Sequence, residues 1–214
     1  MNLAVIGSGG REHAICFKLK QSKGIKKIFC IPGNAGTSIL VENISEDIGN
    51  FEGIYKIIKE KKIDMVIVGP EQPLVDGIVD YLSERKIKVI GPDKFASQLE
   101  GSKAFMKNLC KENNIPTANY GIFNEFNAAL DFIQKNGTPI VVKADGLAAG
   151  KGVTVCQTLE EAKNKTKEIL DGKFKSSKKV VLEEFLEGEE LSYFAIVDHK
   201  SYLYFGSAQD HKRV

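Results

Sequence analysis

The chain has 214 residues, of which 43% are hydrophobic and 27% charged, and its formal net charge is +2. This length allows one large domain or two small domains with buried cores. Only Arg11, Arg85 and Arg213 are arginines, and the lysines are spread along the chain. A nucleic-acid-binding protein usually concentrates arginine on one surface, so we expect no nucleic-acid partner. No apolar stretch approaches membrane-spanning length, so we expect no membrane association either.

The four cysteines lie far apart, and no two of them have the CxxC spacing typical of a zinc site. Cys16, Cys30 and Cys156 lie in apolar runs, and we interpret them as small core residues. Reduced thiols indicate a cytoplasmic location. The apolar run Leu3–Ile6 is too short for a signal peptide and leads directly into Gly7 and a charged segment.

The first half of the chain alternates short apolar runs with segments of helical periodicity. We expect buried parallel strands at Leu3–Ile6, Ile28–Ile31, Met65–Val68 and Val89–Ile90. One helix face is expected from Ile54, Ile57 and Ile58, and another from Leu74, Val75, Ile78, Val79 and Leu82. Strands that alternate with helices predict βαβ units in a doubly wound sheet. We therefore place a Rossmann-like domain with a linking helix at residues 1–118.

The second half has a different pattern. A helix is expected from Ser102 to Glu112, since Ile115 precedes a proline. A second helix would present Phe126, Ala129, Leu130 and Ile133 on one face. Strands are expected at Pro139–Ala144, Gly152–Cys156 and Val180–Phe185. We interpret residues 119–190 as a compact α+β module.

Two local signals complete the pattern of the second half. Thr158 and Glu161 have the spacing of a capping box at the start of another helix. Leu191–Val197 and Tyr202–Ser207 predict a hairpin with His199 near its tip. The hairpin would begin a third unit, at residues 191–214.

Three glycine-containing loops follow predicted strands and would open onto one edge of the first sheet. They are Gly7–His13, Pro32–Thr37 and Gly69–Leu74. Glycines let the first loop approach an anion, and the N–H groups of the following helix, with Arg11, favour phosphate. Ligands of open α/β sheets bind at the carboxyl ends of strands. The three loops together favour a phosphosugar site over ordinary turn chemistry.

The first loop also resembles the dinucleotide-binding fingerprint GxGxxG, with one important difference. Glu12 stands where the third glycine belongs, and the second strand ends in Pro32-Gly33-Asn34 rather than in the acidic residue that holds a ribose. A dinucleotide-dependent oxidoreductase is therefore the weaker alternative. A glycine turn that serves only strand–helix packing also stays open.

The most informative segment is Val141–Val153, which reads VVKADGLAAGKGV. Lys143 lies on a buried apolar strand, where a charge is costly unless it meets a partner. The glycine-rich loop between the two strands can fold over phosphates as a mobile lid. It is not a Walker A loop, because Gly152 rather than Ser or Thr follows Lys151. A flexible hairpin with a snorkelling lysine is the less favoured alternative.

The last apolar strand runs into a cluster of five glutamates at positions 183–190, most of which we interpret as solvated. The three histidines form neither a Ser/His/Asp arrangement nor a metal-ligand spacing. The sequence therefore predicts no metal ligand within this chain.

Taken together, these segments resemble the ATP-grasp ligases and, within them, the glycinamide ribonucleotide synthetase family. The resemblance covers essentially the whole chain and rests most specifically on Val142–Gly152 and Gly7–His13. Gln98–Lys103, Glu183–Glu190 and Gln209–Arg213 add to it. It implies an α/β fold: a Rossmann-like parallel-sheet N-terminal domain, the small α+β lid subdomain of the ATP-grasp fold, and a truncated final ATP-grasp portion.

The resemblance implies an enzyme that joins glycine to 5-phosphoribosylamine with ATP and Mg²⁺. ATP would phosphorylate the glycine carboxylate, and the amine would then displace phosphate, so the protein's task is positioning and charge neutralisation. Family members are roughly twice as long, and the implied Mg²⁺ ligands belong to the other half. We therefore expect this chain alone to be incomplete for catalysis. We also expect a monomer whose partners are small molecules.

The resemblance also implies roles for individual residues. Lys103 and Lys143 would contact the ATP phosphates as catalytic residues. The other nucleotide contacts would come from the lid residues Gly146, Gly150, Lys151 and Gly152, from Glu183, Glu184, Phe185 and Leu186 around the adenine, and from Glu190 at the ribose, with Glu189 as the alternate. The substrate contacts would come from Gly9, Gly10 and Arg11 at the phosphate, from Asn34, Thr37 and Glu71 near its ribose, and from Asp210 near glycine.

Two further alternatives stay open. The chain could belong to another ATP-grasp enzyme of purine synthesis, such as a carboxylase or a transformylase, which substrate preference would distinguish. It could also be a non-catalytic half-protein that binds a nucleotide or a phosphosugar without turnover.

Overall fold

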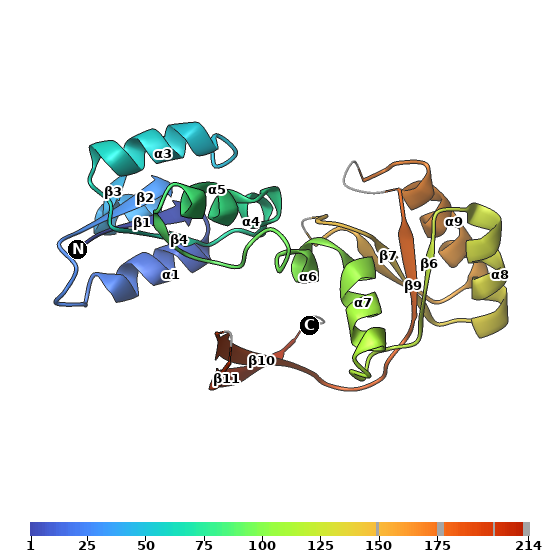
Figure 1. The fold of residues 1–214 in the computed structure, drawn as a ribbon. Helices are drawn as coiled ribbons and strands as arrows, with labels where there is room; N and C mark the ends of the chain where they lie inside the picture. The colour runs from blue at the N-terminus through green and yellow to red at the C-terminus, as the bar shows by residue number, and fades with distance from the viewer. Residues whose placement is uncertain (149, 175–177, 199, 212–214) are drawn as a thin grey trace.

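The computed structural model describes residues 1–148, 150–174, 178–198 and 200–211. Two α/β units lie side by side, with helices α6 and α7 between them and a β hairpin apart from both sheets (Figure 1). In these ranges we find no helix with the length and apolar character needed to cross a membrane.

The first unit is a five-stranded parallel sheet with the order β3-β2-β1-β4-β5. Its strands are β1 (Asn2–Gly7), β2 (Lys27–Pro32), β3 (Glu42–Asn43), β4 (Met65–Val68) and β5 (Lys88–Ile90). Its helices are α1 (Gly10–Leu19), α2 (Ala35–Leu40), α3 (Phe51–Glu60), α4 (Glu71–Asp76) and α5 (Ile78–Glu84). The predicted doubly wound parallel sheet is confirmed. The edge strand β3 was not predicted, because two residues leave no apolar run to recognise.

Both faces of this sheet are buried. Ala4 and Ile6 of β1 pack in the core under α3 and α5, whereas Val5 packs with Cys16 and Cys30 on the opposite face. This two-sided burial is the reason that β1 is a continuous apolar run rather than an alternating one. The prediction that these two cysteines are core residues is confirmed, and both are free thiols.

The helix face predicted over residues 74–82 is divided between two helices. Gly77 adopts a left-handed conformation with φ of 100° and separates α4 from α5. A residue in this conformation cannot continue a helix, and glycine adopts it without steric penalty. Ile78 and Leu82 still face the core, so the apolar period survives the break.

The order of the strands places two loops together. The chain runs from β1 to β2 and β3 on one side, then crosses to β4 on the other side of β1. Strands β1 and β4 are neighbours, and the loops that follow them lead away from each other at the carboxyl edge of the sheet. In open α/β sheets the crevice at such a switch point is the usual ligand site.

The second unit is a four-stranded antiparallel sheet with the order β6-β9-β7-β8. Its strands are β6 (Tyr120–Phe123), β7 (Ile140–Ala144), β8 (Val153–Cys156) and β9 (Val180–Glu184), and its helices are α8 (Phe126–Asn136) and α9 (Leu159–Leu170). Three of these strands were predicted. Strand β6 was not, because its four residues, with a glycine among them, are all only half-buried.

Strands β7 and β9 alternate strictly between two faces. Val142 and Leu182 pack under α8 and α9, in a core that also contains Cys156. Because successive side chains point to opposite sides of a strand, Lys143 and Glu183 project from the other face. The alternation thus places one lysine and one glutamate together on the face opposite α8 and α9.

The predicted capping box at the start of α9 is only half formed. Thr158 is the N-cap, and its hydroxyl accepts a hydrogen bond from the Glu161 N–H at 3.2 Å. The Glu161 carboxylate accepts from the backbone N–H of Gln157 at 2.9 Å, one residue before the cap. The predicted start of this helix at Thr158 is confirmed, whereas the second hydrogen bond of the box comes from Gln157 instead of Thr158.

Helix α7 (Lys103–Glu112) follows the short helix α6 (Gln98–Gly101) and is bound to the second sheet at its first turn. Asp145, directly after β7, accepts hydrogen bonds from the Ser102 hydroxyl and the Ala104 N–H, both at 3.1 Å. Ser102 in turn accepts from the Phe105 N–H at 3.1 Å as the N-cap. A domain boundary at residue 118 would separate α7 from this sheet, and that boundary stays a prediction.

The last element is the antiparallel hairpin of β10 (Glu190–Val197) and β11 (Tyr202–Asp210). The hairpin prediction is confirmed, although β11 extends beyond Ser207. The predicted tip residue His199 lies outside the described residues. Many large apolar side chains of both strands are exposed, among them Leu191 and Phe205.

We expect Asp145→Ala to lower the free energy of unfolding by about 2 kcal/mol, because a buried carboxylate that accepts N–H and hydroxyl hydrogen bonds is lost. Urea unfolding followed by circular dichroism measures the change, and hydrogen exchange should report faster opening at Ala104. The matched control is Asp131→Ala, at an exposed position on α8. Equal midpoints for Asp145→Ala and the control would contradict this role.

Candidate functional site

A cavity of about 360 Å³ lies at the switch point of the first sheet. It is lined by residues 7–12 of the glycine-rich loop, by Ile48, and by Pro70 and Glu71 from the loop after β4. The structure therefore brings Gly9, Gly10, Arg11 and Glu71 together, which are four of the predicted substrate contacts.

Arg11 joins the two loops. Its Nη1 donates to the Gly69 carbonyl at 2.6 Å, and its Nη2 forms an ion pair with Glu71 Oε1 at 3.0 Å. The Glu71 carboxylate accepts a hydrogen bond from the backbone N–H of Glu71 itself and lies beside the Arg11 guanidinium. Both interactions hold the pKa of Glu71 below its usual value, although burial opposes them. Both side chains remain largely exposed, so the pair is open to a ligand.

Glu12 shapes the floor of this cavity, and sequence reasoning gave it no site role. Its buried carboxylate accepts the Gly9 N–H at 2.6 Å. A Cβ added to Gly7 would lie 2.7 Å from Glu12 Cδ, and Gly69 also lacks room for one beside the same carboxylate. Glycines from two loops thus pack around one glutamate. The departure from GxGxxG at this position was the signal that could have revealed it.

The second loop touches the first through Asn34. Its Nδ2 donates to the Ser8 carbonyl at 2.8 Å, and its Oδ1 caps α2 by accepting the Thr37 N–H at 2.9 Å. The Thr37 side chain is fully buried, and its hydroxyl interacts with Asn34 and Asn43. Thr37 therefore braces the loop from within, and its placement near a ribose stays a prediction.

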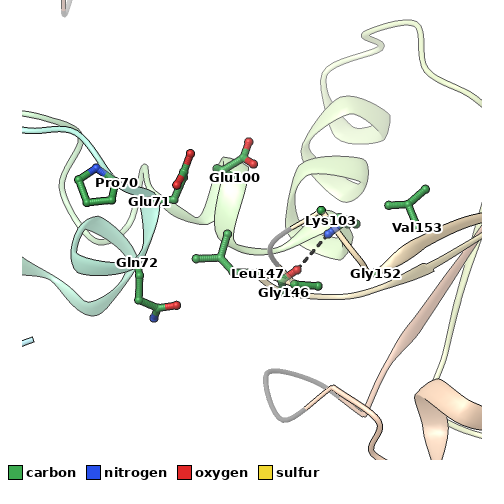
Figure 2. A pocket seen from close by; sticks show the side chains of 11 residues that line it. Pro70, Glu71, Gln72, Glu100, Lys103, Gly146, Leu147, Gly152 and Val153 are labelled. Atoms are coloured by element: carbon green, nitrogen blue, oxygen red, sulfur yellow. Dashed lines mark hydrogen bonds between the residues drawn. The ribbon is translucent and has the colours of Figure 1, made fainter. Parts of the chain in front are cut away.

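A larger cavity of about 660 Å³ lies between the two units (Figure 2). One side is formed by residues 70–72, from the loop after β4 and the start of α4, and by Glu100 of α6. The other side is formed by Lys103 and the glycine-rich loop after β7, including Gly146, Gly150 and Gly152. Glu71 lines both this cavity and the smaller one. Lys151 is exposed and is not among the lining residues, and Ala149 lies outside the described residues.

Lys103 points into this cavity toward the loop, and its Nζ donates to the Gly146 carbonyl at 3.0 Å (Figure 2). Burial is the main reason that the pKa of Lys103 is below its usual value, and the charge of Lys143 acts in the same direction. Asp145 and Glu100 oppose this shift. An amino group in such surroundings favours any anion that arrives beside it.

A third cavity, of about 580 Å³, lies where β9 leaves the sheet. It combines the apolar side chains of Val141 and Val155 with Lys143 and with residues 183–190. The predicted nucleotide contacts that line it are Lys143, Glu183, Glu184, Phe185, Leu186, Glu189 and Glu190. An apolar floor with charged groups at one end suits a flat, partly polar ligand.

Within this cavity Glu184 is already engaged. Its carboxylate accepts from the backbone N–H and the side-chain amide of Asn119, at 2.9 and 3.1 Å. Its own N–H donates to the Asn119 carbonyl at 2.9 Å. The Glu184 N–H is therefore not available to a ligand, and any backbone hydrogen bond to a ligand in this cavity would come from other residues.

The charge of Lys143 is neutralised by a carboxylate, as we predicted for a lysine on a buried strand. Its Nζ lies 2.8 Å from Glu183 Oε1, and Glu183 Oε2 lies 2.8 Å from Lys107 Nζ. Sequence reasoning missed Lys107. The available signal was its spacing, three residues after Ala104 on the buried face of α7.

Asp210 lies on the hairpin opposite Glu190. Both residues line a fourth cavity, of about 610 Å³, together with Phe185 and Leu186. The prediction that Asp210 lies near the acceptor amino acid is not tested by this geometry. Of the segment Gln209–Arg213, residues 212 and 213 lie outside the described residues.

Comparison with known proteins gives a consistent result along the whole chain. Residues 1–100 match the family model for the N domain of phosphoribosylglycinamide synthetase, and residues 101–214 match the model for its ATP-grasp (A) domain. The chain is 49% identical over 215 residues to a phosphoribosylamine–glycine ligase of Mesorhizobium japonicum, and 49% identical over 218 residues to one of Haemophilus influenzae. Each match covers 100% of this chain and 51% of the relative.

Solved structures agree with this result. A phosphoribosylamine–glycine ligase of Thermotoga maritima superposes with a TM-score of 0.82 at 32% identity, over 100% of this chain and 51% of that one. The biotin carboxylase domain of a Hydrogenobacter thermophilus 2-oxoglutarate carboxylase reaches a TM-score of 0.77 at 20% identity, over 97% of this chain and 49% of that one, which shows a shared fold alone. The chain spans about half the length of the curated relatives it matches. Because the two family models together match the chain from residue 1 to residue 214, the chain belongs to the phosphoribosylglycinamide synthetase family.

Proposed function

We propose that the protein containing this chain is an ATP-dependent ligase that joins glycine to 5-phosphoribosylamine and forms glycinamide ribonucleotide, ADP and phosphate. The observation that carries this proposal is that Lys103 and Lys143 line two neighbouring cavities, of which the one with Lys103 is also bordered by the glycine-rich loop after β7. The names of relatives at 49% identity support the choice of substrates.

In this proposal the nucleotide occupies the cavities of the second unit. Its adenine lies on the apolar floor formed by Val141 and Val155, near the backbone of Phe185 and Leu186. Glu190, with Glu189 as the alternate, binds the ribose. Lys103 and Lys143 bind the phosphates, and the loop from Gly146 to Gly152 covers them.

The phosphosugar occupies the smaller cavity of the first unit. The N–H groups at the start of α1 have no partners within the helix, and with Arg11 they favour a phosphate at Gly9 and Gly10. Glu71 and Asn34 border the same loop and suit sugar hydroxyls. Because Glu71 also lines the larger cavity, the amine would face the nucleotide. Asp210 is proposed near glycine.

In this reaction the protein's main task is to position the carboxylate, the amine and the nucleotide phosphates. A carboxylate is a poor acylating agent, and its phosphorylation supplies a leaving group that the amine can displace. A closed lid would protect the acyl phosphate from water. Mg²⁺ would neutralise phosphate charge, and we expect its ligands in the half of the relatives that this chain does not span. Among the described residues we find no cluster of side chains suited to a metal. We place the enzyme in the cytoplasm, as a monomer.

Two alternatives have less support. The N5-carboxyaminoimidazole ribonucleotide synthetases share the fold at TM-scores of 0.71 to 0.73, but at only 16 to 20% identity. A dinucleotide-dependent oxidoreductase is disfavoured because Glu12 stands where the fingerprint has its third glycine and because the second strand does not end in an acidic residue.

The test begins with the coding sequence beyond Val214, so that the complete reading frame can be expressed. We expect ADP release by that protein to require both glycine and 5-phosphoribosylamine. Release that depends on bicarbonate instead would support the carboxylase alternative. Binding of ATP without any turnover would support a non-catalytic protein, and the ligase proposal would be abandoned.

We expect Lys143→Ala to abolish ATP turnover, with a fall of at least about 100-fold, because one positive charge on the reacting phosphates is lost. The fold should survive, since Lys107 still neutralises Glu183. Glycine-dependent ADP release measures the effect, with circular dichroism for the fold. The control is Lys135→Ala, at an exposed site on α8. Near-normal turnover in Lys143→Ala would exclude the assigned role.

ATP affinity should fall as the pH rises, and the fall should begin below the ordinary lysine pKa of 10.5, because the pKa of Lys103 is lowered. Lys103 is fully charged below its lowered pKa and loses its charge above it, so the phosphates lose a partner. We expect the decrease to reach at most about tenfold, as for the loss of one charge-assisted contact, and calorimetry at increasing pH measures it. In Lys103→Arg the guanidinium stays charged, and the decrease should be smaller. Identical pH profiles for the two proteins would contradict this explanation.

A further inference from the structure

One buried carboxylate in the second unit lies between two lysines. Glu183 on β9 has a side chain only 6% exposed, and each of its oxygens lies 2.8 Å from a lysine Nζ. Lys143 comes from the neighbouring strand β7, and Lys107 comes from α7, whose first turn is hydrogen-bonded to Asp145 at the end of β7. A buried charge is strongly unfavourable unless a partner neutralises it, so this cluster is under a tight charge constraint.

The two lysines are not equivalent. Lys107 is 3% exposed, and its Nζ also donates to the Thr117 hydroxyl at 2.7 Å and to the Ala118 carbonyl at 3.4 Å. Lys143 is 24% exposed and lines the cavity assigned to the nucleotide. Among the residues that the structure describes, Glu183 Oε1 has no partner besides the Lys143 ammonium group, 2.8 Å away. Lys107 is therefore fixed, whereas Lys143 can turn toward a ligand.

We propose that Lys107 is a positioning residue that acts as the counter-ion of Glu183 and thereby leaves the charge of Lys143 available to nucleotide phosphates. This inference rests on the proposed nucleotide site and adds to it a residue that never touches the nucleotide. One carboxylate cannot neutralise two lysines, so the cluster keeps an excess positive charge. Since Lys107 has no access to the cavity, that excess is presented by Lys143.

The alternative arrangement shows what Lys107 contributes. Without it, Glu183 would be a buried carboxylate whose single partner is Lys143, and separating that pair would leave an uncompensated buried charge. Lys143 would then stay on Glu183 when ATP arrives. Phosphate binding should weaken, although no residue that contacts ATP has changed.

The experiment uses the protein expressed from the complete reading frame, with ATP and adenosine as the two probes in calorimetry. Lys107→Met removes the charge at similar length, and the double variant Lys107→Met/Glu183→Gln removes both members of the buried pair. The matched control is Lys111→Met, one turn further along α7 at an exposed position. Lys143→Met tests the proposed site itself.

We expect Lys107→Met to weaken ATP binding about tenfold, as for the loss of one charge-assisted contact, and to leave adenosine binding within about threefold of the native value. The double variant should bind ATP more tightly than Lys107→Met, because Lys143 no longer has a carboxylate to neutralise. Lys111→Met should change neither affinity.

Three outcomes would overturn the inference: equal weakening of ATP and adenosine in Lys107→Met, no weakening of ATP, or a double variant that binds ATP as poorly as the single one. If Lys107→Met does not fold, Lys107→Gln takes its place in the comparison with the double variant, and ATP binding by Lys107→Gln as tight as native would equally overturn the inference. Failure of the proposed function looks different. In that case the native protein binds no ATP, or Lys143→Met binds it normally.

Discussion

Helix α7 and the four-stranded sheet are held together by two buried carboxylates, and the candidate nucleotide site depends on this attachment. Asp145 caps the first turn of α7, and Glu183 binds Lys107 near its middle. Lys103 begins the helix, and Lys143 precedes Asp145 by two residues. Lys103 and Lys143, for which we propose a role at the phosphates, are thus held on elements that are bound to each other, although the two residues are 40 positions apart in the sequence.

In the first unit the candidate phosphosugar site is formed by loops rather than by strands. Strand order places the loops after β1 and β4 at one crevice, and Arg11 spans them through Gly69 and Glu71. Glycines bring the backbone close, and the start of α1 supplies N–H groups. The Rossmann-like sheet determines where these loops diverge, and the side chains determine what can bind.

Much of this architecture could be predicted from the sequence because it follows from local periodicity. Continuous apolar runs gave the buried strands, and the lysine on the apolar strand Val141–Ala144 correctly required a partner. The partner's identity depends on which strand lies beside β7, which no local pattern specifies. Lys107 was missed for the same reason: a lysine on an amphipathic helix is usually solvated, and only the carboxylate from β9 explains its burial. Strand β6 and the break at Gly77 escaped prediction because four half-buried residues and one glycine leave weak signals.

The packing of Gly7, Gly9 and Gly69 around Glu12 has a consequence for how this loop can change in evolution. A side chain at Gly7 or Gly69 would collide with the glutamate, and a shorter residue at position 12 would leave the Gly9 N–H without its acceptor. No single substitution in the group is therefore neutral by itself. The four positions form an epistatic unit, in which acceptable variants require coordinated replacements in two loops about sixty residues apart.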